Sequence, residues 1–148
     1  MKKKVKGKRI CTKAKGTKAE RELFHMFWEN GWGCARVAGS GSTQRPATDL
    51  LASDGSKVLA LECKAIKNDK KYFSEADVEQ ILHFSTKFGA EPWIAMRFDN
   101  IGWFFVHMDN LAESKGKSFF VSLDFAKKKG KTFDELVGKF EQTRLVEE

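Results

Sequence analysis

Two stretches of the chain repeat their apolar residues with the period of an α-helix. Positions i+3, i+4, i+7 and i+8 after Glu20 are Leu23, Phe24, Phe27 and Trp28, and Gly31 follows. A second stripe precedes Gly89 and consists of Val78, Ile81, Leu82, Ser85 and Phe88, with Phe84 on a neighbouring face. Each stripe follows a Ser/Thr-x-x-acid pattern, at Thr17 and at Ser74, which is typical of a capping box. Glycine commonly ends a helix. The sequence therefore predicts helices over about 17–30 and 74–88.

Shorter apolar runs predict strands. They lie at 34–38, on both sides of an Asp-Gly turn within 48–65, and at 92–98, 103–108 and 118–123. Residues 39–47 predict a flexible Gly/Ser loop, 67–73 a charged connection, 127–131 a basic turn and 133–140 a short helix. The order helix, three strands, helix, two strands predicts an α/β fold with a mixed central β-sheet flanked by helices.

The hairpin over 48–65 carries charges where a core strand is expected. Asp-Gly at 54–55 favours a two-residue turn, which pairs residue 53 with 56 and residue 49 with 60. Residues that are opposite each other, or two apart on one strand, share a face of the sheet. Asp49, Glu62 and Lys64 are therefore expected to project from the same side, and the other face is apolar.

Two adjacent carboxylates repel each other unless a cation lies between them. Oxygen ligands with open positions suit Mg²⁺ or Mn²⁺, which keep several waters and accept phosphate oxygens of a substrate. A lysine two residues further on could steer or deprotonate the attacking water. The same pattern also fits a cross-strand ion pair on a solvated sheet face, and the pattern by itself does not decide between the two.

Charge is distributed unevenly along the 148 residues. Nine Lys and Arg and no acidic residue precede Glu20, whereas residues 20–148 carry 18 basic and 20 acidic side chains, which gives +7 in total. Residues 1–16 predict a disordered basic arm that binds polyanions, with a solubilising tail or a targeting address as the alternative. Residues 17–148 predict one domain.

The cysteine pattern and the absence of long apolar segments both indicate an intracellular protein. Three Cys in unpatterned positions predict reduced thiols in an intracellular protein, and three dispersed His make zinc unlikely to be bound. No apolar segment has the length of a signal peptide core or a membrane span, so a cytoplasmic protein is expected.

Several segments in order resemble the PD-(D/E)xK nucleases, and most closely the archaeal Holliday junction resolvases. These segments are KGTKAERELF, ARVAGSGS, PATDLLA, LALECKA and FSTKFGAEPWIAMRF. The resemblance covers about residues 15–108. The family often has proline directly before the first aspartate of the motif, whereas Thr48 stands there in this chain.

The resemblance implies a restriction-endonuclease-like core and a homodimeric, Mg²⁺-dependent endodeoxyribonuclease, with Mn²⁺ able to substitute. Such an enzyme resolves four-way DNA junctions through paired symmetric nicks. By position, Glu20, Asp49 and Glu62 would hold the metal, Lys64 would position or activate the water, and Ser40 would act from the loop. The implied DNA contacts are Lys15, Lys18, Arg21, Arg36, Ser40, Ser42 and Arg45. Glu20 could alternatively do no more than cap its helix.

Two other functions remain open from the sequence. One is a nuclease that acts on other branched or nicked DNA, and the other is a branched-DNA-binding protein that does not cleave. The presence of Asp49, Glu62 and Lys64 together favours an enzyme. Neither a membrane nor a small-molecule substrate is expected as a partner.

Overall fold

The computed structural model describes residues 2–37, 45–114 and 118–139, and of residues 2–15, 112–114 and 118 it describes the backbone alone. The helices are α1 Lys2–Glu29, α2 Glu75–Phe88, η1 Met108–Asn110, α3 Leu123–Lys129 and α4 Phe133–Leu136. The strands are β1 Gly33–Arg36, β2 Leu50–Ser53, β3 Val58–Ile66, β4 Lys70–Ser74, β5 Glu91–Phe98, β6 Gly102–His107, β7 Ala112–Ser114 and β8 Ser118–Ser122. In this part of the chain no helix has the length and apolar character needed to cross a membrane.

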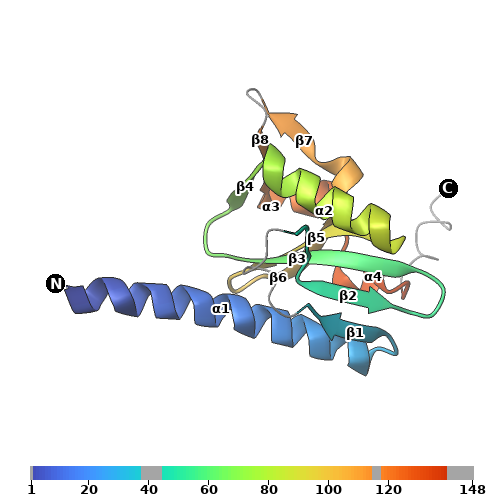
Figure 1. Cartoon of the computed structure of the whole chain (residues 1–148), viewed down its shortest axis with the longest axis horizontal. Helices are drawn as coiled ribbons and strands as arrows, with labels where there is room; N and C mark the ends of the chain where they lie inside the picture. Colours follow the sequence, from blue (N-terminus) through green and yellow to red (C-terminus); the bar gives the residue numbers. More distant parts are fainter. Residues whose placement is uncertain (1, 38–44, 115–117, 140–148) are drawn as a thin grey trace.

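The described strands include a central five-stranded sheet with the order β1-β2-β3-β5-β6. Strands β3 and β5 are parallel, and the other neighbouring pairs are antiparallel. Helix α1 covers one face of the sheet and α2 covers the other (Figure 1). The predicted mixed α/β architecture is therefore confirmed, and β3 lies in its centre, between the two helices.

Each face of the sheet has its own apolar core. On the α1 face, Leu23 and Phe27 pack with residues of the sheet that include Leu61. On the α2 face, Val78 and Ile81 pack with residues that include Ile94 and Met96. Full burial of one such side chain stabilises the fold by about 1.5–3 kcal/mol. Because neighbouring residues of a strand point to opposite faces, Glu62 lies on the α2 side of β3, and its partner on β5 is Ile94.

Helix α1 begins earlier than predicted. It runs from Lys2, so Thr17 and Glu20 lie inside it, and the capping box predicted at Thr17 is wrong. Lys, Arg and Ala are frequent in this segment and have high helix propensity, which favours continuing the helix in the N-terminal direction. The division into an arm over 1–16 and a domain over 17–148 stays a prediction.

The hairpin between β2 and β3 also differs from its predicted pairing. Ser53 pairs with Val58 rather than Ser56, and the connection has four residues. The Asp54 side chain explains this, because its Oδ1 accepts hydrogen bonds from the backbone N–H groups of Ser56 at 2.8 Å and Lys57 at 2.9 Å. A register shift of two residues leaves every side chain on its predicted face.

Helix α2 begins as the sequence predicts. Ser74 is its N-cap, and Ser74 and Asp77 form the reciprocal hydrogen bonds of a capping box. Gly89 ends the helix in the left-handed region, with φ of 64°. The predicted apolar stripe is wrong in part, because Phe84 is buried whereas Leu82 and Phe88 are exposed. The Phe84 ring stacks on that of Phe88.

A second sheet among the described residues has the order β4-β8-β7. Strand β8 confirms the strand predicted at 118–123, whereas β4 lies in the segment predicted as a charged connection. Its sequence, KKYFS, buries Phe73 and exposes its other residues, so it has too little apolar alternation to signal a strand. The basic turn predicted at 127–131 is wrong, because Lys127, Lys128 and Lys129 form the last turn of α3. Helix α4 ends at Leu136, before the predicted end at 140.

Candidate active site

The start of β2 is tied to the centre of β3 by hydrogen bonds to one carbonyl. The Thr48 hydroxyl donates to the Leu61 carbonyl oxygen at 2.7 Å, and the Asp49 N–H donates to the same oxygen at 3.1 Å. Thr48 is fully buried. The threonine that stands where the resembled family often has proline therefore anchors the segment that carries Asp49.

Asp49 lies beside the charged part of β3. Its Oδ2 accepts a hydrogen bond from the Cys63 N–H at 2.9 Å. Burial, a hydrogen bond with Asp49 and the charge of Asp49 raise the pKa of Glu62 to about 9, against a smaller lowering effect of Lys64. In the absence of a cation the Glu62 carboxyl is therefore expected to keep its proton at neutral pH. The predicted convergence of the Asp49 and Glu62 carboxyl groups is confirmed.

Lys64 adds a positive charge to the same site. It follows Glu62 by two residues on β3, so both side chains are on the same face of the strand. The positive charge of Lys64 acts to lower the pKa of Glu62 and also that of Glu20. The charge of Lys64 thus interacts with a carboxyl group on β3, that of Glu62, and with one on α1, that of Glu20.

Glu20 reaches the site from α1. Burial and the charge of Asp49 raise the pKa of Glu20, and the charges of Arg36 and Lys64 oppose this effect. Its Oε1 lies 3.4 Å from Nη2 of Arg36 on β1. Because α1 begins at Lys2, Glu20 does not cap the helix, and that alternative is wrong. Glu20 instead contacts Arg36, and its carboxylate is influenced by the charges of Asp49 and Lys64.

The donor set fits a hard divalent cation. No group of three or more His, Cys, Asp and Glu side chains in the described part of the chain is arranged to hold a metal ion by itself. Mg²⁺ needs no such cage, since it commonly binds one or two carboxylates and completes its shell with waters and substrate phosphates. Asp49 and Glu62 supply such a pair, and a cation that replaced the proton of Glu62 would offset the repulsion between the two carboxylates.

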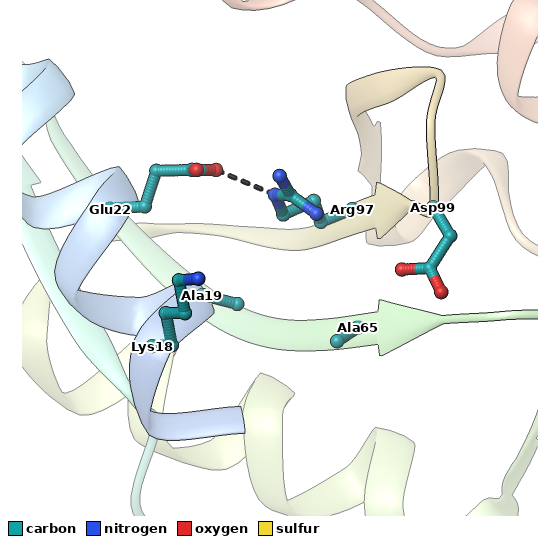
Figure 2. Close-up of a pocket in the computed structure, with 6 residues that line it drawn as sticks. All are labelled: Lys18, Ala19, Glu22, Ala65, Arg97 and Asp99. Atoms are coloured by element: carbon teal, nitrogen blue, oxygen red, sulfur yellow. Dashed lines mark hydrogen bonds and ion pairs between the residues drawn. The ribbon is translucent and has the colours of Figure 1, made fainter. Parts of the chain in front are cut away.

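The implied DNA contacts are placed unevenly. Arg21 and Arg45 are exposed, and Arg36 is exposed apart from its contact with Glu20. Lys18 lines a small pocket between α1 and the ends of β3 and β5 (Figure 2). Ser40 and Ser42 lie outside the described residues, as does the side chain of Lys15. The roles of all these residues in DNA binding stay predictions.

A polar cluster on the other flank of α1 was not predicted from the sequence. Oε2 of Glu22 accepts hydrogen bonds from Arg97 Nε at 2.7 Å and from Trp103 Nε1 at 2.6 Å. Burial acts to raise the pKa of Glu22, but the two hydrogen bonds and the charge of Arg97 outweigh it and hold the pKa below its usual value. The three residues are distant in sequence, so no local pattern could have indicated their contact.

The fold and the paired carboxylates define a restriction-endonuclease-like nuclease core. A bacterial homing endonuclease, I-Ssp6803I, has the same fold, with a TM-score of 0.52 and 13% sequence identity over 93% of this chain and 98% of that one. The sequence profile described as "Archaeal holliday junction resolvase (hjc)" matches residues 11–145. The chain belongs to this family.

Individual relatives agree with that assignment. The crossover junction endodeoxyribonuclease Hjc of Archaeoglobus fulgidus is 36% identical over 135 residues, which are 91% of this chain and 98% of the relative. The protein of the same name from Methanocaldococcus jannaschii is 30% identical over 88% of this chain and 92% of its own length. The solved structure of Archaeoglobus fulgidus Hjc, a Holliday junction resolvase, superposes with a TM-score of 0.76 over 85% of this chain and 98% of that chain.

Proposed function

We propose that this protein is a structure-specific endonuclease that resolves four-way DNA junctions by hydrolysing phosphodiester bonds. The observation that carries the proposal is the half-buried Asp49–Glu62 carboxyl pair beside Lys64, in a chain that belongs to the archaeal Holliday junction resolvase family. Placing Glu62 next to Asp49 on a core strand offers the fold no evident benefit, because burial and the neighbouring carboxyl group disfavour the charged form of Glu62. It is suited to binding a cation at a DNA phosphate.

The residues have separate tasks in this proposal. Asp49 and Glu62 hold Mg²⁺, and Mn²⁺ can substitute since both ions favour oxygen ligands. Glu20 adds negative charge from α1, while Arg36 limits its repulsion against Asp49. When bound, the ion supplies charge stabilisation to the phosphoryl group and lowers the pKa of water. Lys64 orients or deprotonates the attacking water and stabilises the charge that develops on the phosphate.

Hydrolysis is an in-line displacement at phosphorus. The water oxygen forms a bond to phosphorus on the side opposite the 3′ oxygen, and the bond between phosphorus and the 3′ oxygen breaks. The proton lost from the attacking water passes to solvent, and the 3′ oxygen takes a proton from solvent as it leaves. The products carry a 5′ phosphate and a 3′ hydroxyl group.

Paired nicks call for two copies of this site. A four-way junction has approximate twofold symmetry, so an isologous homodimer would present one Asp49–Glu62 pair to each of two related strands. Support for a dimer comes from α2, where Leu82 and Phe88 are exposed next to the buried Phe84. Strand β6 offers less support, because Phe105 and Val106 are buried within the chain. Sedimentation equilibrium at micromolar protein without DNA tests this assembly, and a monomer mass would contradict it.

Incubation with a panel of DNA substrates tests the function. A synthetic four-way junction, a fork and a linear duplex of the same sequence are compared in Mg²⁺, with product strands mapped on each arm. The proposal predicts cutting of the four-way junction on two symmetry-related strands, with much slower cutting of the linear duplex. Faster cutting of the fork would favour a nuclease for other branched DNA. Tight junction binding without any cutting would favour a non-cleaving binding protein.

A further inference from the structure

Helix α1 lies on the sheet with its two carboxylates on opposite flanks. Ala19, Leu23 and Phe27 are buried and form the row that faces the sheet. Successive residues of an α-helix are rotated by about 100°, so Glu20 projects to one side of this row and Glu22 to the other. On one side Glu20 meets Arg36 of β1, and on the other Glu22 meets Arg97 of β5 and Trp103 of β6. The helix is therefore attached to the sheet by charged contacts on both flanks.

The contact at Glu22 is the shorter and better defined of the two. Arg97 and Trp103 both donate to the same oxygen of Glu22, at 2.7 and 2.6 Å, whereas the Glu20–Arg36 distance is 3.4 Å. Hydrogen bonds to a charged acceptor are about twice as strong as neutral ones. Figure 2 shows Glu22 of α1 and Arg97 of β5 pointing toward each other across the pocket. Arg97 and Trp103 are direct cross-strand partners, so the sheet holds both donors in place.

A small rotation of α1 about its own axis would displace the Glu20 carboxylate. Side chains extend about 5–6 Å from a helix axis, so a roll of about 10° moves a carboxylate by roughly 1 Å. A misplacement of about 1 Å can reduce an enzymatic rate on the order of 100-fold. The apolar row over Ala19 and Leu23 resists lifting of the helix but is less directional, because packing does not fix orientation as a hydrogen bond does. The contacts on the flanks are thus best placed to control roll.

We propose that Glu22, Arg97 and Trp103 form a positioning clamp that sets the roll of α1 and thereby holds the Glu20 carboxylate beside Asp49. The inference rests on the proposed nuclease function, since it assigns the clamp to the same site. None of the three clamp residues needs to touch DNA for this role. Arg97 and Glu22 act through the helix, on a carboxylate that lies on its opposite flank.

Kinetics of matched variants test the clamp. Single-turnover junction cleavage and junction affinity are measured for Glu22→Ala, Arg97→Ala and the double variant. Asp134→Ala serves as the control, because it removes a different ion pair, with Lys139 at 3.8 Å, which contains no clamp residue. The clamp predicts a rate reduced about tenfold or more in both single variants, unchanged junction affinity, and no further reduction in the double variant. Glu22→Gln keeps an acceptor for both donors and is expected to retain most of the rate.

Other kinetic results would overturn the clamp. An Arg97→Ala variant that binds the junction more weakly but cuts at the wild-type rate would make Arg97 a direct DNA contact. Equal rates in wild type and Glu22→Ala would remove any positioning role. Additive effects in the double variant would show that Glu22 and Arg97 act separately.

Amide NMR of the DNA-free and metal-free protein separates failure of the clamp from failure of the proposed function. Glu22→Ala is expected to shift the Trp103 indole N–H resonance and also, across the helix, the Arg36 Nε–H and the Cys63 amide that donates to Asp49. Asp134→Ala is expected to shift neither of these two distant signals. Shifts confined to the surroundings of Trp103 would overturn the clamp, whether or not the wild-type protein cuts junctions. Distant shifts together with an inactive wild type would support the clamp and contradict the nuclease function.

Discussion

Glu62 is a carboxyl group in the middle of a core strand, with Asp49 as its neighbour. Burial and the charge of Asp49 disfavour the ionised form of Glu62, so without a cation its carboxyl is expected to keep its proton at neutral pH. Proton and cation therefore compete for one position. This competition links folding stability, metal affinity and activity to Glu62. Removing its charge is therefore expected to raise the stability of the metal-free protein, whereas loss of the metal site is expected to lower activity.

Replacing Glu62 by Gln is expected to stabilise the metal-free protein. The folded-state pKa of Glu62 is about 9, against an unfolded value near 4.5. Stability from the protonated carboxyl is fully present below the unfolded value and is lost as pH rises toward the folded one. At pH 7 the gain from Glu62→Gln should be up to about 3 kcal/mol, and at pH 4 it should vanish. Urea unfolding of both proteins at pH 4 and pH 7, in the presence of chelator, measures this gain in the free energy of unfolding. A gain that is equal at the two pH values would contradict the raised pKa of Glu62.

Loss of Asp49 or Lys64 is expected to separate binding from cutting. Asp49→Ala and Lys64→Ala should each reduce junction cleavage by a factor of about 100 or more, in line with the loss of a directly acting charged group. Junction affinity should change little, because binding comes mainly from Lys and Arg contacts to phosphates. Gel-shift and cleavage assays on the same samples measure both quantities. A variant that still cuts at close to the wild-type rate would show that its assigned role is wrong.

The site residues differ in how far the sequence could predict them. Asp49, Glu62 and Lys64 were predictable because a strand has a period of two and a hairpin brings its halves together, and a two-residue error in register does not change the face. Thr48 and the Glu22–Arg97–Trp103 cluster were not predictable, because their bonds join residues that only the packed fold brings together. Glu20 was found from its position in the motif, although its predicted capping geometry was wrong.

Among the helices and strands, α2 is one whose ends could be predicted from local sequence signals alone. Its capping box and its terminal glycine are both encoded within a few residues, and both occur as predicted. Strand β4 shows the opposite case, since its pairing with β8 joins distant segments and only Phe73 carries its burial. The length of α1 also escaped prediction, because a short capping pattern was given more weight than a long run of helix-forming residues.

The N-cap of α2 offers a stability test at this scale. Ser74→Ala removes the hydroxyl that accepts from the Asp77 N–H and should lower the free energy of unfolding by about 1 kcal/mol. Thr86→Ala is the control in the same helix. The Thr86 hydroxyl donates a hydrogen bond to the Leu82 carbonyl oxygen within the helix, and such a bond adds little to helix stability. Denaturant unfolding compares the two, and a cost for Thr86→Ala equal to that for Ser74→Ala would argue against a capping effect.

On the scale of the whole molecule, the charge distribution indicates that attraction to DNA and hydrolysis depend on different parts of the chain. The basic residues before Glu20 extend along α1, the same helix that brings Glu20 to the site (Figure 1). Residues 20–148 have a slight excess of acidic side chains. Attraction to DNA phosphates is therefore expected to depend strongly on the N-terminal segment, whereas hydrolysis depends on the sheet. The mixed sheet itself followed from the order of the predicted elements.

Deleting residues 2–13 tests this separation. The deletion removes seven of the nine basic residues that precede Glu20. Counterion release predicts that the slope of log K against log salt falls in magnitude by ~0.9 for each phosphate that the shortened protein no longer neutralises. The cleavage rate at saturating protein should remain close to that of the full chain. Junction binding measured over a series of salt concentrations gives the slope, and an unchanged slope would show that this segment does not bind DNA.

The most direct test of the carboxylate-pair site is the Mg²⁺ dependence of single-turnover junction cleavage at several pH values between about 6 and 9. Because Glu62 must lose its proton to hold the ion, the Mg²⁺ concentration needed for half-maximal rate should fall by up to about tenfold per pH unit in this range. Chelator should abolish cutting, and Asp49→Asn should remain inactive at every concentration. Cutting that persists in chelator, or a Mg²⁺ requirement that does not change with pH, would contradict a cation site built on Asp49 and Glu62.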